Sequence, residues 1–271
     1  MDKATIGFIG LGSQGGPMAR RLIESGFRVV LWARRPEALA PFADVSFEAA
    51  TSLRDLAVRV EHVAICVVDD AGVKQVCDEV IPAMRPGGRI AIHSTVHPHT
   101  VIDLARQAKD RGLALIDAPV SGGGPAATAR TLTVMCGADE AVFVAARPIF
   151  EAFGGLIVRV GDPGAGQMAK LVNNALMAAH LALAHHALAS AGALGIDVSA
   201  LKEIIKASSG RSFGFDVYAR LPNAFAFDHG AKLLLKDVRL LAEVVGSDPS
   251  FTAIREVALP FLEFVQRGDL R

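Results

Sequence analysis

Residues 5–15 read Thr-Ile-Gly-Phe-Ile-Gly-Leu-Gly-Ser-Gln-Gly, and this stretch decides the fold. An apolar run, Thr5–Ile9, predicts a strand, and the glycines after it have the spacing G-x-G-x-x-G. In a dinucleotide-binding turn the first glycine permits the tight turn, the second admits a pyrophosphate, and the third lets a helix pack closely. The predicted cofactor contacts are Gly10, Leu11, Gly12, Ser13, Gln14 and Gly15. The alternative is a glycine-rich turn that binds no ligand.

Short apolar runs alternate with amphipathic or charged segments through the first 160 residues. This alternation is typical of a mostly parallel sheet covered by helices on both faces, so the predicted fold class is α/β with a Rossmann-type doubly wound sheet. The predicted strands are Thr5–Ile9, Arg28–Trp32, His62–Val68, Arg89–His93, Leu113–Asp117, Thr131–Cys136 and Leu156–Val160. The predicted helices are Gly16–Ser25, Gly72–Glu79, Pro98–Arg111 and Glu140–Phe153.

The pattern changes at the turn-rich segment Gly161–Gly166, because apolar residues at helical spacing dominate from there on. We therefore expect two domains, a dinucleotide-binding Rossmann domain over residues 1–160 and an all-α C-terminal domain for substrate binding and dimerisation over residues 161–271. The helices predicted in the second domain are Gly166–Leu194, Ser199–Ser208, Arg211–Leu221, His229–Val245 and Phe251–Arg267.

One stretch of the second domain, Leu171–Ile196, contains no Asp, Glu, Lys or Arg and is long enough to cross a bilayer. Alanine is its most frequent residue, and it includes three histidines; both residue types drive membrane insertion weakly compared with leucine or isoleucine. A fully buried helix is therefore the favoured interpretation, and a membrane span is the alternative.

Charge and cysteine content narrow the class of protein. The chain has 28 Lys+Arg and 28 Asp+Glu, so it offers no overall attraction to nucleic acid or to an anionic membrane. Cys66, Cys77 and Cys136 are odd in number and stand mostly in apolar runs, as reduced core thiols do. Because the N-terminus also lacks a signal-peptide pattern, we expect a cytoplasmic protein.

The residues at the end of the second predicted strand indicate the preferred cofactor, because NAD enzymes have an acidic residue there that hydrogen-bonds the ribose. This chain has Arg34 and Arg35 there and no acid before Glu37. Two guanidinium groups suit a 2′-phosphate in charge and in hydrogen-bond geometry. We therefore predict NADP(H), with NAD possible; solvated arginines at the start of a helix are the alternative.

Four segments that span most of the chain, the first of which contains the glycine motif, together resemble the β-hydroxyacid dehydrogenase family. The opening GFIGLGSQGGPMARRL is similar to the family's GFIGLGxMGxPMAxxL, with Gln14 in place of methionine. The other similar segments are the DAPVSGG at Asp117–Gly123, the GDPGAG at Gly161–Gly166 followed by Lys170 and Asn174, and the KD at Lys236–Asp237.

The resemblance implies roles for particular residues of this chain. Lys170 is the implied catalytic residue, and Ser121, Gly122, Gly123 and Asn174 are the implied substrate contacts. The implied cofactor contacts outside the glycine turn are Val67, Val68, Thr95 and Lys236. Two departures from the family pattern, Gln14 and Arg130, leave the particular substrate open.

The chemistry of an alcohol dehydrogenation agrees with these roles, since it needs a hydride acceptor, a proton shuttle and a clamp for the substrate carboxylate. Lys170 suits the proton shuttle, because it is the only Lys, Arg, Asp or Glu between Asp162 and Asp197. Asn174 lies one helical turn further on the same face. The run Ser121–Gly124 offers consecutive backbone N–H groups and a hydroxyl for a carboxylate; a flexible loop is the alternative.

Arg211 follows a Ser-Ser-Gly turn and could contact a second carboxylate or several hydroxyls, although an ordinary surface or interdomain charge is an equal alternative. Six of the histidines, His93, His97, His99, His180, His185 and His186, are clustered in two groups. Neither group has nearby cysteines or the spacing of a shared metal site, so we expect no metal.

These observations predict an NAD(P)-dependent oxidoreductase that transfers a hydride between the nicotinamide cofactor and a small β-hydroxy acid or its semialdehyde. The expected partners are a small carboxylate substrate and further copies of the chain in a homodimer or homotetramer, with no nucleic acid and no membrane. One alternative is an imine reductase on the same scaffold, although such enzymes carry Asp or Tyr in place of Lys170. The other is a non-catalytic cofactor-sensing module, which is expected to lose that lysine.

Overall fold

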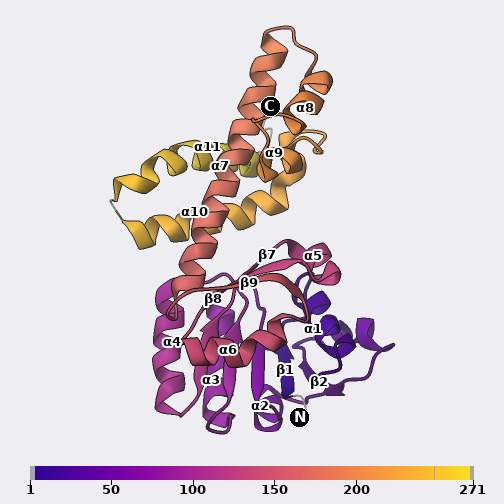
Figure 1. Cartoon of the computed structure of the whole chain (residues 1–271), viewed down its shortest axis with the longest axis vertical. Coiled ribbons are helices and arrows are strands. Elements are labelled where there is room, and N and C mark those ends of the chain that lie inside the picture. The colour runs from indigo at the N-terminus through magenta and orange to yellow at the C-terminus, as the bar shows by residue number, and fades with distance from the viewer. Residues whose placement is uncertain (1–3, 247, 269–271) are drawn as a thin grey trace. The chain divides into compact units, whose positions relative to one another are not determined.

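The computed structural model describes residues 4–246 and 248–268 (Figure 1). The chain divides into two compact units, Met1–Lys170 and Leu171–Arg271. The outer ends of the two predicted domains, residues 1–3 and 269–271, lie outside the described residues.

The first unit is built on a nine-stranded sheet with the order β3-β2-β1-β4-β5-β6-β8-β7, and β9 pairs with β8. All neighbours from β3 to β6 are parallel, whereas β8 runs antiparallel to β6 and β7. The order β3-β2-β1-β4-β5-β6 is that of a dinucleotide-binding doubly wound fold, which confirms the predicted fold class. The strands are β1 Thr5–Ile9, β2 Arg28–Trp32, β3 Glu48–Ala49, β4 His62–Ile65, β5 Arg89–Ile92, β6 Ala114–Asp117, β7 Val120–Ser121, β8 Leu132–Gly137 and β9 Gly154–Gly161.

Helices cover both faces of the sheet because successive side chains of a strand point to opposite faces. In β1, Ile6 and Phe8 belong to a core cluster with residues of α1, α5 and α6. Ile9 belongs to a second cluster with residues of α2, α3 and α4. The helices of this unit are α1 Gly15–Glu24, η1 Pro36–Phe42, α2 Leu53–Arg59, α3 Asp70–Ala83, α4 Pro98–Asp110, α5 Gly123–Ala129 and α6 Glu140–Phe150, and α7 begins at Ala165.

Several short elements of the first unit are missing from the sequence prediction: η1, α2, α5, β3 and β7. α2 has only seven residues and begins where the Ser52 side chain accepts a hydrogen bond from the Asp55 N–H. α5 begins with two glycines and a proline, a composition that favours a loop. The prediction of strand for His62–Val68 is also too long, since β4 ends at Ile65.

The second unit is all helical, as predicted. α7, Ala165–Ala193, runs into it from the first unit and is followed by α8 Val198–Lys206, α9 Phe213–Tyr218, η2 Ala224–Phe227, α10 Asp228–Val245, η3 Pro249–Phe251 and α11 Thr252–Arg267. The predicted helix Arg211–Leu221 is shorter than expected because the Ser212 hydroxyl caps it by accepting the Phe215 N–H. Among the described residues, no helix combines the length and the apolar character needed to span a membrane.

Candidate active site

The glycine turn between β1 and α1 has the backbone geometry that its spacing predicts. Gly10 has a φ of +97°, and a Cβ there would lie 2.2 Å from the Cys66 carbonyl oxygen. A Cβ at Gly15 would lie 2.0 Å from the Gly10 oxygen, so the helix and the turn meet without room for a side chain. Packing within the protein therefore requires glycine at both positions.

Gly12 differs from these two glycines, because a Cβ there would meet no atom within 4 Å. No atom of the described residues fills the space that the missing side chain leaves. The first turn of α1 contains no acidic residue, and no side chain caps it. An anionic pyrophosphate fits this turn, because open space, backbone N–H groups and the positive end of the helix dipole are all present.

The turns after β4 and β5 border the same edge of the sheet as the glycine turn, because β1, β4 and β5 are parallel neighbours. Val67 is half-buried and donates its N–H to the Ser94 hydroxyl at 2.8 Å, which joins the two turns. Val68 is 81% exposed, and Thr95 is half-buried. Three of the predicted cofactor contacts thus lie at the carboxyl edge, where ligands of such sheets bind.

Asp117, at the end of β6, holds the beginning of α7. Its carboxylate accepts the Gly164 N–H at 2.8 Å and the Gln167 N–H at 2.7 Å. Burial raises the pKa of Asp117 to about 6, although the backbone N–H groups oppose this shift. Gly166 is required at this contact, since a Cβ there would lie 2.4 Å from the Met135 carbonyl oxygen. The start of the helix that carries Lys170 is therefore fixed against the carboxyl end of β6.

Lys170 lies one turn beyond Gln167 on α7, and only 9% of its surface is exposed. Gln167 is fully buried; its side-chain amide donates to the Ser94 carbonyl at 2.9 Å and accepts the Val96 N–H at 3.1 Å. The turn of α7 that leads to Lys170 is thereby bonded to both residues that flank Thr95. A lysine in such a buried setting is a candidate for proton transfer.

The predicted carboxylate-binding segment packs against the glycine turn. A Cβ at Gly124 would lie 2.4 Å from the Ser13 carbonyl oxygen, so α5 and the turn are in close contact. Gly122 and Gly123 have φ values of +127° and +71°, which residues with side chains rarely adopt. Ser121 is half-buried at the end of β7. Both glycine-rich segments therefore lie in the first unit and next to each other.

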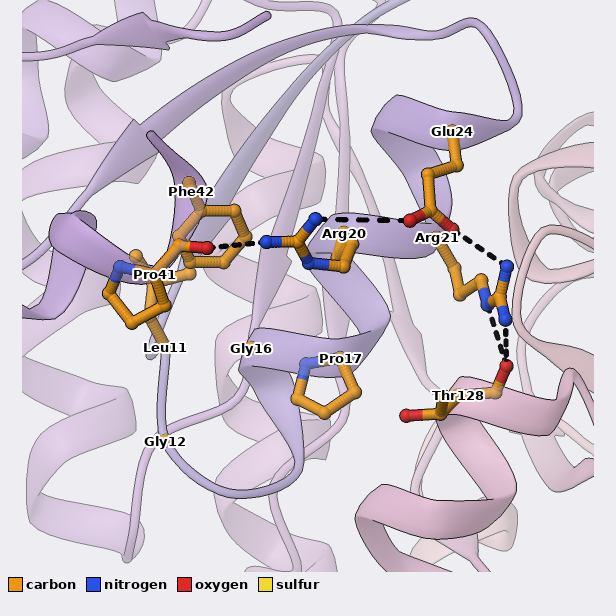
Figure 2. A pocket seen from close by; sticks show the side chains of 10 residues that line it. All are labelled: Leu11, Gly12, Gly16, Pro17, Arg20, Arg21, Glu24, Pro41, Phe42 and Thr128. Carbon is orange, nitrogen blue, oxygen red and sulfur yellow. Dashed lines mark hydrogen bonds and ion pairs between the residues drawn. The ribbon is translucent and has the colours of Figure 1, made fainter. Parts of the chain in front are cut away.

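Arg34 and Arg35 follow β2, and both side chains are exposed. Within the described residues, neither guanidinium takes part in an ion pair or a hydrogen bond. Two other arginines line a cavity of about 330 Å³ that borders Gly12 (Figure 2). Those are already engaged, Arg20 by Asp44 and Arg21 by Glu24. Charge available for an anionic ligand is therefore found on Arg34 and Arg35 rather than in the cavity.

In the second unit, three predicted site residues have partners of their own. Asn174 donates its side-chain N–H to Asp237 at 2.6 Å, and the Lys236 ammonium lies 3.2 Å from the same carboxylate. Arg211 donates to Asp216 at 3.0 Å and keeps 60% of its side chain exposed. The Asp216 pair agrees with the alternative interpretation of Arg211 as a surface charge.

Two of the residues that organise the site, Asp117 and Gln167, were not among the predicted site residues. In the sequence, Asp117 stands out only as the first residue of the DAPVSGG segment, and Gln167 only as a neighbour of Lys170 on a helix. Their function depends on backbone groups that come from distant parts of the chain, and no local pattern encodes such partners. The only sequence signal is a polar residue in an apolar setting, which predicts a hydrogen bond without naming the partner.

The histidines of the first unit serve packing and local hydrogen bonds. The buried His93 ring has a Nδ1 at 2.8 Å from the Ala118 carbonyl oxygen and stacks on Phe8. Burial lowers the pKa of His93 to about 4, so the ring is neutral at physiological pH. Within the described part of the chain, no group of three or more His, Cys, Asp or Glu could hold a metal ion.

The fold and the carboxyl-edge geometry define a class of protein, the dinucleotide-binding proteins with a doubly wound domain. Two family models match the chain: the NAD-binding domain of 6-phosphogluconate dehydrogenase over residues 5–161, and the NAD-binding region of NADP-dependent 3-hydroxyisobutyrate dehydrogenase over residues 164–258. Together they span most of both units.

Individual proteins agree with the family models. The chain is 34% identical to NAD-dependent L-serine dehydrogenase of Pseudomonas aeruginosa, over 94% of this chain and 89% of the relative. It is 30% identical to human mitochondrial 3-hydroxyisobutyrate dehydrogenase, over 92% of this chain and 78% of the relative. A solved structure of Mycobacterium tuberculosis 3-hydroxyisobutyrate dehydrogenase with L-serine has a TM-score of 0.84 and 25% identity, and it covers 98% of this chain and 99% of that one. The chain belongs to the β-hydroxyacid dehydrogenase family.

Proposed function

We propose that this chain interconverts a small β-hydroxy acid and its semialdehyde, with Lys170 as the proton donor and acceptor and NADP(H) as the preferred cofactor. One observation carries the proposal: Lys170 is almost fully buried on a helix whose first turn is bonded to the carboxyl ends of β5 and β6. In a sheet of this topology, that edge is where the nicotinamide cofactor and its substrate bind.

The bound nicotinamide cofactor supplies the hydride in reduction and accepts it in oxidation. During reduction the Lys170 ammonium donates a proton to the carbonyl oxygen, which becomes the hydroxyl, and the resulting amine regains a proton from solvent. During oxidation the neutral amine accepts the hydroxyl proton and releases it to solvent afterwards. The buried position of Lys170 favours both steps, since it keeps bulk water away from the proton that is transferred.

We assign the substrate carboxylate to the segment Ser121–Gly123. The backbone of both glycines has positive φ, the Ser121 hydroxyl is adjacent, and the segment packs on the cofactor turn through Gly124 and Ser13. Backbone N–H groups in such a segment bind an anion without a charged side chain. The substrate class follows from the names of the relatives, since L-serine and 3-hydroxyisobutyrate both carry a hydroxyl on carbon 3 of a carboxylic acid.

The proposed preference for NADP(H) rests on Arg34 and Arg35, which follow β2 and have no ion pair or hydrogen bond in the part of the chain that the structure describes. A 2′-phosphate offers oxygens to which a guanidinium can donate two parallel hydrogen bonds. The absence of an acidic residue before Glu37 removes the usual partner of an unphosphorylated ribose.

The proposal is tested by measuring kcat/KM with NADPH and NADH on the semialdehydes of tartronate and methylmalonate, and with NADP+ and NAD+ on 3-hydroxyisobutyrate and L-serine. We expect turnover of at least one of these compounds and a higher kcat/KM with the phosphorylated cofactor. Turnover of a cyclic imine in place of all of them would identify an imine reductase. Cofactor binding without any turnover would support the cofactor-sensing alternative.

A further inference from the structure

Gln167 forms a structure that we call the Thr95 clasp: its side-chain amide bonds to the residues on both sides of Thr95. The amide donates to the Ser94 carbonyl at 2.9 Å and accepts the Val96 N–H at 3.1 Å. The side chain is 0% exposed, so water cannot replace either bond. A planar amide satisfies one acceptor and one donor of the loop at once, which a methionine, a leucine or a lysine at this position could not do.

The clasp belongs to a continuous set of hydrogen bonds along the carboxyl edge. On one side, the Ser94 hydroxyl accepts the Val67 N–H at 2.8 Å, which adds the turn after β4. On the other side, the backbone N–H of Gln167 itself donates to Asp117 at 2.7 Å, which adds the end of β6. One residue of α7 is therefore connected to the carboxyl ends of three neighbouring strands.

Lys170 lies three residues after Gln167, and residues three apart are neighbours on the surface of a helix. The position of the Lys170 ammonium relative to the Thr95 turn therefore depends on the clasp. The proton and the hydride are transferred to the same substrate molecule, so the Lys170 ammonium and the Thr95 turn must be held at a fixed position relative to each other. A displacement of about 1 Å can lower a reaction rate by about 100-fold.

We propose that Gln167 is a positioning residue that holds the lysine helix in register with the cofactor-binding turn after β5. This inference rests on the proposed function, because it holds that the position of α7 relative to the turn after β5 affects the rate of hydride transfer. Gln167 does not touch substrate in this mechanism; it acts through Thr95 on one side and through Lys170 on the other.

The principal test is Gln167→Met, which keeps the length of the side chain and removes both hydrogen bonds. Amide exchange of the cofactor-free protein, followed by mass spectrometry, reads the clasp directly. We expect the Val96 amide to exchange about tenfold faster or more, because its acceptor is gone. We expect kcat to fall about 10- to 100-fold, and the dissociation constant of NADPH, from its fluorescence, to change less than about threefold.

A primary isotope effect separates positioning from a loss of folded protein. With cofactor deuterated at the transferred position, the isotope effect on kcat rises in Gln167→Met when the hydride step has become slower. A smaller folded fraction lowers the apparent kcat and leaves the isotope effect unchanged. The matched control is Gln107→Met, the same chemical change at an exposed position of α4, which should alter none of these quantities.

Gln167→Glu provides a second variant in case the methionine variant does not fold. A protonated carboxyl offers one donor and one acceptor, as the amide does, whereas the carboxylate can only accept. Burial raises the pKa of such a carboxyl, so the protonated form is accessible at mildly acidic pH. We therefore expect the ratio of variant to wild-type kcat to increase as the pH falls.

Retention of kcat within about threefold in Gln167→Met, together with faster exchange at Val96, would overturn the proposal, because the clasp would be lost without any effect on the chemistry. A lower kcat with an unchanged isotope effect would also overturn it, since the role would then be structural alone. Unchanged exchange at Val96 contradicts the clasp whether or not the protein turns over. The absence of turnover by the wild-type protein contradicts the proposed function instead.

Discussion

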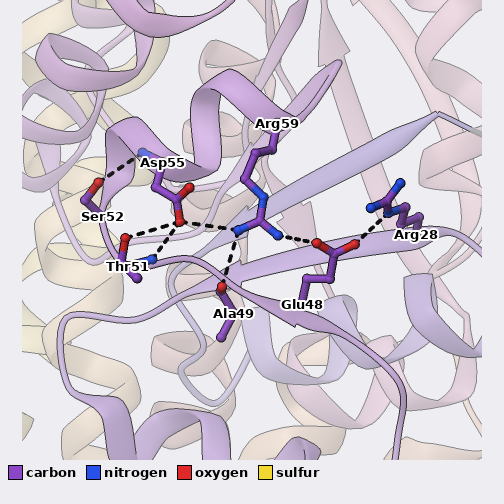
Figure 3. A network of polar contacts seen from close by, with 7 residues as sticks. All are labelled: Arg28, Glu48, Ala49, Thr51, Ser52, Asp55 and Arg59. Carbon is purple, nitrogen blue, oxygen red and sulfur yellow. Dashed lines mark hydrogen bonds and ion pairs between the residues drawn. The ribbon is translucent and has the colours of Figure 1, made fainter.

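The charged side chains at the two edges of the parallel sheet differ in whether they form ion pairs. At the amino edge, Glu48 lies between Arg28 and Arg59, and Arg59 also faces Asp55 (Figure 3). At the carboxyl edge, Arg34 and Arg35 have no such partner among the described residues, and α7 presents a lysine within a long uncharged stretch.

The difference indicates which charges maintain the structure and which await a ligand. A charge in an ion pair is compensated by its neighbour of opposite sign, so it attracts a charged ligand only weakly. A guanidinium without a partner among the described residues keeps its attraction for an anionic ligand. Function is therefore expected at the carboxyl edge and tolerance to substitution at the amino edge.

The largest effect is expected for Lys170→Ala, which removes the proton shuttle of the carboxyl edge. We expect kcat to fall by a factor of about 10² to 10⁴, because general acid–base catalysis typically contributes that much. Cofactor binding, measured by NADPH fluorescence, should persist. Lys74→Ala, at an exposed position of α3, is the matched control and should keep full activity. Wild-type turnover by Lys170→Ala would refute the mechanism.

The next effect concerns pH and a histidine at the amino edge. His62 is fully buried, and neither ring nitrogen has a hydrogen-bond partner among the residues that the structure describes. Burial lowers the pKa of His62 to about 3. The unfolded chain takes up this proton near pH 6.5, so the folded state loses stability as the pH falls from 6.5 towards 3. His62→Leu should reduce that loss by about 2–3 kcal/mol at pH 4.5.

Urea unfolding at pH 7 and pH 4.5 measures this difference, with His229→Leu, at an exposed position of α10, as the control. Asp117 acts in the opposite sense, because its pKa of about 6 makes the folded state more stable as the pH falls from 6 to 3.8. Both proteins keep Asp117, so its contribution cancels in the comparison. Equal acid sensitivity of His62→Leu and the wild type would contradict the prediction.

A smaller effect is expected for the unpaired arginines. Replacing Arg34 and Arg35 by alanine, singly and together, should raise the KM for NADPH about tenfold or more and leave the KM for NADH nearly unchanged, because only NADPH carries the 2′-phosphate. Steady-state kinetics with both cofactors measure the ratio. A parallel loss with both cofactors would mean that the arginines contact a part common to both. A wild-type preference for NADH would remove the proposed role altogether.

The smallest effect is expected for the ion pairs at the amino edge. Arg28 and Arg59 hold the pKa of Glu48 below its usual range, and the carboxylate is solvent-accessible. Because exposed ion pairs contribute little and are screened by salt, Glu48→Gln should leave kcat/KM within about twofold of wild type. Thermal unfolding at low and high salt should show a small destabilisation that disappears at high salt. A large loss of activity would contradict the distinction between the two edges.

The sheet, its order of elements and the glycine turn were predictable, because each depends on a local pattern. The strands Thr5–Ile9 and Arg28–Trp32 have the predicted bounds, since both are apolar runs with clear ends. Elements without an apolar period of useful length were missed: α2 has seven residues, and α5 starts with two glycines. Such elements form because neighbours bury them, and that contribution is invisible in a single segment.

By itself, the sequence determined the fold class, the glycine turn and the lysine on an uncharged helix, because spacing and residue type act over a few neighbouring positions. Only the tertiary structure decided that Gln167 bonds to both neighbours of Thr95, that Asp117 holds the start of α7, and that Arg211 is paired. The sequence separates Gln167 from Ser94 by 73 residues, and folding brings their polar atoms to 2.9 Å. Buried polar groups take their partners from wherever the fold supplies them, so these contacts become visible only once the chain is folded.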